Sequence, residues 1–99
     1  MKNLQFDKQK VEDFCRRNHI RKMAFFGSVL RADFNADSDV DVLVEFEPGN
    51  EVGMLRMSAM ERELASLFGR VVDLRTPAEL SRFIRDRVVA GSEVGFVSG

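Results

Sequence analysis

Acidic side chains crowd the segment "RADFNADSDVDVLV", residues 31–44, in which Asp39 and Asp41 stand two positions apart. If a strand begins at residue 39, the two carboxylates share one face, about 6.5 to 7 Å apart along the backbone. Their repulsion is then on the order of 2 kcal/mol at an effective dielectric of about 20. A divalent cation would reverse the sign of that interaction. Calcium, magnesium ions carrying a nucleotide, and water alone are the alternatives that this pattern leaves open.

A third carboxylate, Asp73, lies in "VVDLR", residues 71–75. Alternation along a strand directs Val72 and Leu74 into the core and Asp73 to the other face. If this strand lies beside that of the first two aspartates, the carboxylates can converge. Carboxylates on adjacent strands can hold two metal ions about 3.5 to 4 Å apart, as in nucleotidyl transfer. The simpler interpretation of this aspartate is an exposed residue paired with Arg75.

Gly27 and Ser28 directly follow the apolar segment "RKMAFF", residues 21–26. Glycine lets a backbone approach a phosphate closely, and a serine hydroxyl and neighbouring N–H groups can donate to it. Arg31 can reach the same anion with its planar guanidinium. Each feature alone also has a simpler interpretation, namely an ordinary turn and an Arg31–Asp33 pair.

Helices and short strands alternate in the predicted fold. Helical spacing of apolar residues predicts two helices, and β-branched or apolar runs predict three strands. The predicted helices cover residues 7–18 and 52–68, and the predicted strands cover residues 21–26, 39–46 and 71–75. This order predicts an α/β or α+β domain with a small sheet backed by helices.

The C-terminal part of the chain predicts a third helix and a loose tail. Thr76 and Glu79 form a capping box around Pro77, which is a strong helix start. The side chains expected on the buried face of this helix are Leu80, Phe83, Ile84 and Val88. From Gly91 onward the chain contains two further glycines, and we expect this tail to be held loosely.

Composition limits the class of protein. The 99 residues, 44% of them apolar, predict a single domain over residues 1–99 with a modest core. The formal net charge of -1 gives no reason to expect direct nucleic-acid binding. No apolar run approaches the roughly 20 residues of a membrane span, and the N-terminus lacks a signal-peptide stretch. Cys15 is the only cysteine, so we expect a core position for it and a reducing, cytoplasmic setting.

The combination of Gly27-Ser28, Asp39-x-Asp41 and Asp73 resembles the nucleotidyltransferase superfamily typified by DNA polymerase beta, in particular its minimal MNT members. The similarity is carried by "FFGSVLRADFNADSDVDVLVEFEPG" and "FGRVVDLRTPAEL" and spans about residues 20–90. It implies a minimal nucleotidyltransferase fold, a small mixed sheet flanked by helices. The implied reaction moves a nucleoside monophosphate from a triphosphate to an acceptor and releases pyrophosphate.

The resemblance also implies roles for the carboxylates. Asp39 and Asp41 would hold two magnesium ions. Asp73 would complete the ligand set of the catalytic ion and help to deprotonate the acceptor hydroxyl. A nucleoside triphosphate, ATP in the simplest case, would be the substrate. Nothing in the sequence identifies a residue that reads the base.

Phosphate binding is implied for the upstream motif, with two departures from the family pattern. Gly27 and Ser28 would cradle the β- and γ-phosphates, and Arg31 would support them. Members often carry Arg or Tyr after the serine and glycine after the later arginine. This chain has Val29 and Ala32 there, which leaves weaker triphosphate binding open.

MNT proteins are commonly antitoxins paired with HEPN-domain ribonucleases, and some transfer AMP onto the toxin. The resemblance therefore implies an antitoxin that adenylylates a hydroxyl of a HEPN partner. The alternative is a non-catalytic antitoxin that neutralises its partner by binding. Because the chain has no room for a second domain, the acceptor must dock on this one, which favours a protein partner or a homo-oligomer. Met54, Met57 and Met60 are expected in the core, with a groove for a partner protein as the alternative.

A calcium loop is the main rival for the acidic segment. Asp33, Asn35 and Asp37 match positions one, three and five of an EF-hand. However, Ser38 stands where the turn glycine is required and Val44 where the bidentate glutamate is required. A predicted strand follows instead of a helix. The pattern therefore favours magnesium over calcium, and these two outer aspartates are expected to be solvated.

Overall fold

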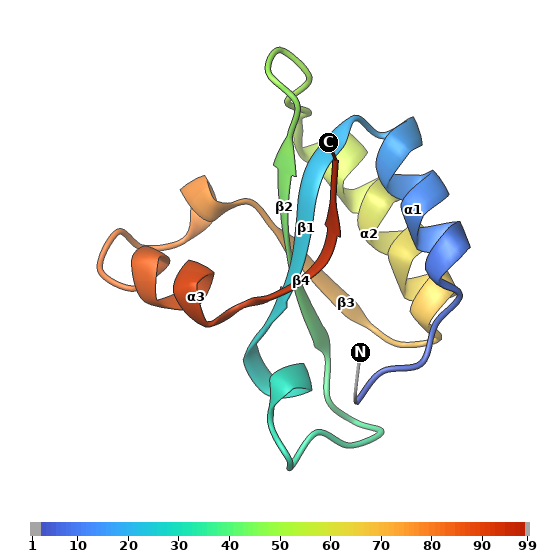
Figure 1. Cartoon of the computed structure of the whole chain (residues 1–99), viewed down its shortest axis with the longest axis vertical. Helices are drawn as coiled ribbons and strands as arrows, with labels where there is room; N and C mark the ends of the chain where they lie inside the picture. Colours follow the sequence, from blue (N-terminus) through green and yellow to red (C-terminus); the bar gives the residue numbers. More distant parts are fainter. Residues whose placement is uncertain (1–2, 99) are drawn as a thin grey trace.

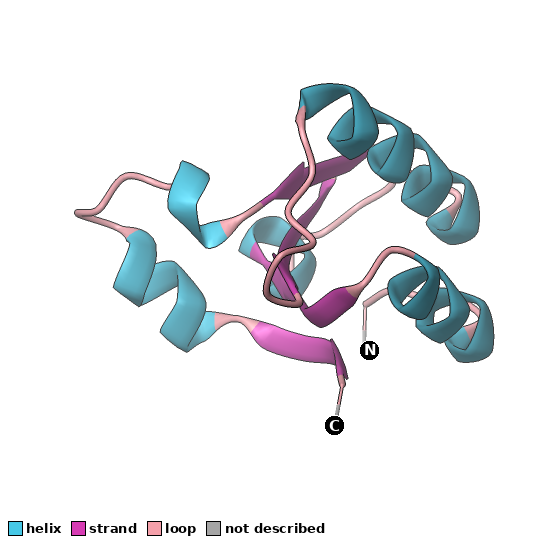
Figure 2. Ribbon diagram, turned by 90° about the horizontal axis from the view of Figure 1, so that it is seen from above, coloured by secondary structure: helices cyan, strands magenta, loops and turns pink. Residues whose placement is uncertain are grey.

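A computed structural model describes residues 3–98, in which a sheet is covered by two helices on one side while a third projects on the other (Figures 1 and 2). The long elements are α1 (Lys8–Arg17), β1 (Ile20–Phe26), β2 (Val40–Phe46), α2 (Met54–Phe68), β3 (Val72–Arg75), α3 (Arg85–Gly91) and β4 (Glu93–Val97). Two 3-10 turns, η1 (Gly27–Leu30) and η2 (Pro77–Glu79), follow β1 and β3. The first two helices and first three strands confirm the predicted elements to within two residues.

The sheet is mixed, with strand order β3-β2-β1-β4. The central strand β1 is antiparallel to both of its neighbours. β2 and β3 are parallel, and α2 provides the crossover that a parallel connection requires. The predicted fold class, a small mixed sheet flanked by helices, is confirmed.

The core lies between the sheet and the α1–α2 layer. Val40, Val42 and Val44 are fully buried at alternate positions of β2, as their spacing predicted. Met60 and Leu64 of α2 are buried in the same cluster. Because alternate side chains of a strand point to opposite faces, this burial directs Asp41 to the other face of the sheet.

The predicted third helix is wrong in extent and in its buried face. The capping box forms, since the Glu79 carboxylate accepts from the N–H and hydroxyl of Thr76, but it supports only the short η2. The chain is extended at Leu80, and α3 begins only at Arg85.

Two of the side chains expected to be buried there are instead exposed, Phe83 by 80% and Ile84 by 44%. The reason is a competing contact, because the Arg85 guanidinium donates to the carbonyls of Pro77 and Leu80 at 2.8 and 3.1 Å. Those bonds satisfy carbonyls that a continuous helix would have paired with its own N–H groups.

The C-terminal segment is also corrected, because the tail expected to be loose forms β4 against β1. Phe96 is buried in the core cluster, and β4 covers an edge of β1 that would otherwise be open. Gly95 permits this approach, since a Cβ there would lie 2.7 Å from Cε2 of Phe25. The glycine that suggested looseness is therefore a close-packing residue.

Cys15 is a core residue, as predicted, and burial raises the pKa of its thiol to about 12. Met60 is buried and Met57 packs against the core, which confirms the prediction for these two methionines. Met54 contradicts it, because its side chain at the start of α2 is 88% exposed.

Within the described part of the chain, none of the helices combines the length and the apolar character that crossing a bilayer demands.

Candidate active site

Two of the three predicted carboxylates, Asp41 and Asp73, lie side by side where β2 and β3 begin, and the third, Asp39, directly precedes β2. Asp41 and Asp73 are register partners on these adjacent parallel strands. Asp73 lies between the buried Val72 and Leu74 and therefore shares the face of Asp41, away from α2. Asp39 immediately precedes β2 and is exposed. The tertiary structure thus brings together residues from two distant segments, as the sequence predicted.

The electrostatics of Asp41 show that the three groups interact. The pKa of Asp41 is raised, first by burial and then by the negative charges of Asp73 and Asp39. The backbone amide of Ser28 and the charge of Arg31 lower the pKa of Asp41 and so act in the opposite direction. The folded structure therefore disfavours the charged form of the Asp41 carboxyl group.

Gly27 makes this arrangement sterically possible. Its φ is +75°, in the left-handed region that favours glycine. A Cβ at this position would stand 2.3 Å from Oδ2 of Asp41, which is far inside van der Waals contact. The hydroxyl of Ser28 donates to the Asp39 carbonyl at 3.3 Å. The Gly27-Ser28 pair thus positions the aspartates. The sequence predicted only phosphate binding for this pair, and this second role was missed.

Arg31 follows η1 and contacts the acidic loop, which is the segment between η1 and β2. Its Nε lies 3.4 Å from Oδ1 of Asp33, so the simpler interpretation of this arginine is present in the structure. Both side chains are largely exposed. The positive charge of Arg31 also acts on Asp41, where it opposes the rise in pKa of that carboxyl group.

The residues fit magnesium by their chemistry. Asp39, Asp41 and Asp73 offer the oxygen ligands that this ion prefers, and a cation among them would relieve the repulsion at Asp41. Within residues 3–98, no three His, Cys, Asp or Glu side chains already meet closely enough to hold an ion. The Asp73 carboxylate instead contacts Arg75, with Nε 3.1 Å from Oδ1. This contact occupies one oxygen of the Asp73 carboxylate.

Arg70 holds the acidic loop and was not predicted. Its Nη1 donates to the carbonyls of Asn35 and Ser38, at 2.8 and 3.2 Å. Its guanidinium carbon also lies 4.2 Å from the centre of the Phe34 ring. Within the loop, the Asn35 side-chain oxygen accepts from the N–H of Asp37. Arginine and local hydrogen bonds thus order the segment in which the calcium alternative would place an ion.

Replacing Arg70 with glutamine is expected to loosen this loop. The variant loses the stacking on Phe34 and at least one hydrogen bond from a charged donor, about 1 to 2 kcal/mol of stability together. Urea denaturation measures the stability, and hydrogen exchange at the Ser38 amide, which bonds the Asn35 carbonyl, measures the loop. The exposed Arg62→Gln provides the charge-matched control. Unchanged exchange in the Arg70 variant would refute the anchoring role.

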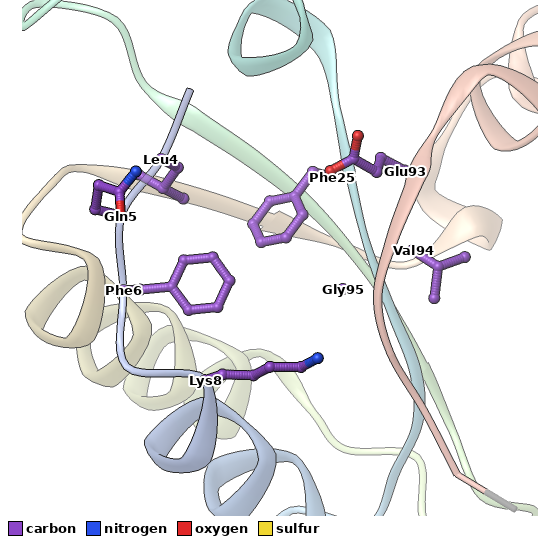
Figure 3. Close-up of a pocket in the computed structure, with 8 residues that line it drawn as sticks. All are labelled: Leu4, Gln5, Phe6, Lys8, Phe25, Glu93, Val94 and Gly95. Carbon is purple, nitrogen blue, oxygen red and sulfur yellow. The ribbon is translucent and has the colours of Figure 1, made fainter. Parts of the chain in front are cut away.

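A separate hollow of about 210 Å³ lies between the N-terminal segment and β4. Figure 3 shows Phe6 and Lys8 on one side of it and Glu93, Val94 and Gly95 on the other. None of the predicted site residues lines this hollow. The hollow is thus separate from the carboxylate cluster at the start of β2 and β3.

Comparison with known proteins agrees with this geometry. The sequence signature of the nucleotidyltransferase domain matches residues 8–93. The chain is 37% identical over 71 residues to protein adenylyltransferase MntA of Thermococcus cleftensis, covering 71% of this chain and 69% of the relative.

Two solved structures share the fold. A crystallised toxin–antitoxin with AMP-PNP superposes with a TM-score of 0.75 at 20% identity, covering 93% of this chain and 74% of that chain. A complex of the tri-AMPylated HEPN toxin of Shewanella oneidensis with its MNT antitoxin gives 0.61 at 20% identity, with coverage of 92% and 70%. Motif spacing, carboxylate geometry and sequence similarity agree, and the chain belongs to the nucleotidyltransferase domain family, in its minimal MNT group.

Proposed function

We propose that this protein transfers AMP from ATP to a hydroxyl of a HEPN-domain toxin and so acts as its antitoxin. The observation that carries the proposal is the pairing of Asp41 with Asp73 across β2 and β3, with Asp39 acting on the same carboxylate. The protein adenylyltransferase name of the Thermococcus cleftensis relative supports this reaction. The tri-AMPylated HEPN toxin in the Shewanella oneidensis complex supports the acceptor.

Magnesium would be held by Asp39, Asp41 and Asp73, two ions in all as the resemblance implies. Bound there, it would supply the positive charge that offsets the triphosphate and the charge developing on the leaving oxygens. Arg31, whose charge reaches Asp41, would bind the triphosphate from the η1 side. Gly27 would let the triphosphate approach the backbone, beside its role in seating Asp41.

The reaction would be an in-line exchange of bonds at the α-phosphorus. The acceptor oxygen forms a bond to this phosphorus while the bond to the oxygen bridging the α- and β-phosphates breaks. Pyrophosphate carries away the electron pair of the broken bond. Asp73, the carboxylate on the edge strand β3, would take the acceptor proton. Its 40% exposed side chain leaves room for an incoming hydroxyl.

Neutralisation by binding alone is the second candidate, and the exposed apolar side chains of Met54 and Leu55 favour it. The two departures from the family motif, Val29 and Ala32, support neutralisation by binding less than these exposed side chains do. Val29 is fully buried and serves the core, while Ala32 is exposed beyond η1. Neither position adds a side chain that obstructs the carboxylates.

Label transfer separates these two functions. The chain is mixed with magnesium, a HEPN-domain protein encoded beside it, and ATP labelled at either the α- or the γ-phosphate. Nucleotidyl transfer puts only the α-label on the partner, and EDTA abolishes it. Asp39→Ala/Asp41→Ala is expected to lose labelling and neutralisation together. Asp37→Ala/Asp86→Ala, which removes the same charge from exposed positions, retains both.

If the Asp39→Ala/Asp41→Ala variant neutralises the partner as well as the wild type does, binding alone is the function. A cytoplasmic location and a homo-oligomer, expected from the lone cysteine and the small size, stay predictions beside this proposal.

A further inference from the structure

Arg75 engages both carboxylate oxygens of Asp73. Nε lies 3.1 Å from Oδ1 and Nη2 lies 3.5 Å from Oδ2. This is the two-point grip that a planar guanidinium makes on a carboxylate, although the second contact is long. A magnesium ion needs oxygen lone pairs of the same group. The ion and the arginine are therefore alternative partners for Asp73.

The backbone keeps this contact inside the active site. Asp73 and Arg75 alternate with buried residues on β3 and so share the face of Asp41. Their register partners on β2 are Asp41 and Leu43. Arg75 therefore stands two residues past Asp73, at the next position on the same face of β3.

The contact can open without rearranging the fold. The Arg75 side chain is 46% exposed and that of Asp73 is 40% exposed, so neither is enclosed by the core. The negative charges of Glu79 and Glu61 also reach the guanidinium. An arginine released from Asp73 thus stays beside other carboxylates, which reduces the cost of its departure.

We propose that Arg75 is a positioning residue that competes with the divalent cation for Asp73. The Asp73 carboxylate then joins the metal site only when its ion pair with Arg75 is broken. The inference rests on the proposed function, since it takes the three aspartates as the metal site. Without a cation, Arg75 holds Asp73 and offsets one of the clustered negative charges. With a cation, the same side chain lowers the apparent affinity of the site.

The test is to titrate the full chain with Mn²⁺ as the only added ligand. Electron paramagnetic resonance measures the concentration of free Mn²⁺. Arg75→Gln is expected to bind Mn²⁺ roughly threefold to fivefold more tightly than wild type, as expected for loss of an exposed competing ion pair. Arg82→Gln removes the same charge from an exposed residue whose guanidinium lies over Phe83, and it sets the effect of net charge alone. Asp73→Asn with and without Arg75→Gln completes a double-mutant cycle.

In the Asp73→Asn background, Arg75→Gln is expected to tighten Mn²⁺ binding no more than Arg82→Gln does. Equal tightening by Arg75→Gln and Arg82→Gln would overturn the inference, as would tightening beyond the Arg82→Gln level that persists in the Asp73→Asn background. Either result leaves the proposed function standing. If neither wild type nor Arg75→Gln binds Mn²⁺ at millimolar concentration, the metal site of the proposed function fails and the inference fails with it.

Discussion

Asp41→Asn is expected to reduce AMP transfer on the order of 10³-fold while the protein stays folded, the upper range for loss of one preorganised electrostatic group. The substitution keeps an oxygen that can accept from the Ser28 N–H, so the turn between β1 and β2 retains its contact. It removes the charge at the point where Asp39 and Asp73 act together. The rate of α-label transfer to the partner measures this loss.

The same substitution is expected not to lower stability. Because the folded state raises the pKa of Asp41, its charged form costs folding free energy at neutral pH, and a neutral side chain removes that cost. The thermal midpoint in EDTA should therefore equal or exceed that of wild type. Asp37→Asn, an exposed change in the same loop, serves as control and should retain activity. A variant that transfers AMP at a tenth of the wild-type rate or better would contradict the assignment of Asp41.

Gly27→Ala is expected to damage both the fold and the site. The residue must adopt φ of +75°, and its new Cβ would meet Oδ2 of Asp41 at 2.3 Å. We expect the free energy of unfolding to fall by about 2 to 3 kcal/mol, from backbone strain and the displaced carboxylate. Moving that carboxylate by about 1 Å is expected to reduce transfer on the order of 10²-fold. Urea denaturation and the labelling assay measure the two effects.

Gly49→Ala separates strain from contact. Gly49 has φ of +81° in the turn after β2, and a Cβ there would meet nothing within 4 Å. It should therefore lose only about 1 kcal/mol from the strained backbone and keep full activity. If the two variants lose activity equally, the contact between Gly27 and Asp41 is not what positions the carboxylate.

Local patterning accounts for the part of the site that was predicted. Val40, Val42 and Val44 alternate with Asp39 and Asp41, and burial of the valines leaves only one face for the acids. Val72 and Leu74 do the same for Asp73. Such alternation depends on neighbours along the chain, and a sequence displays those directly.

The two wrong predictions, for the third helix and for the C-terminal tail, have a different cause. The helix predicted after Thr76 breaks because Arg85 reaches back to carbonyls five and eight residues earlier. The expected tail becomes β4 because β1, about 70 residues earlier in the chain, has an edge to cover. Both outcomes depend on partners that no local pattern names.

The amino-acid sequence by itself determined the element order up to β3, the faces of its strands and the types of residue in the carboxylate cluster. Only the tertiary structure decided that Asp41 and Asp73 stand in register, that Gly27 seats Asp41, and that Arg70 and Arg75 hold the loop and Asp73. Strand faces follow from the two-residue repeat of the backbone and need no distant partner. Register and side-chain partners depend on which segments pack together, and they exist only once the chain has folded.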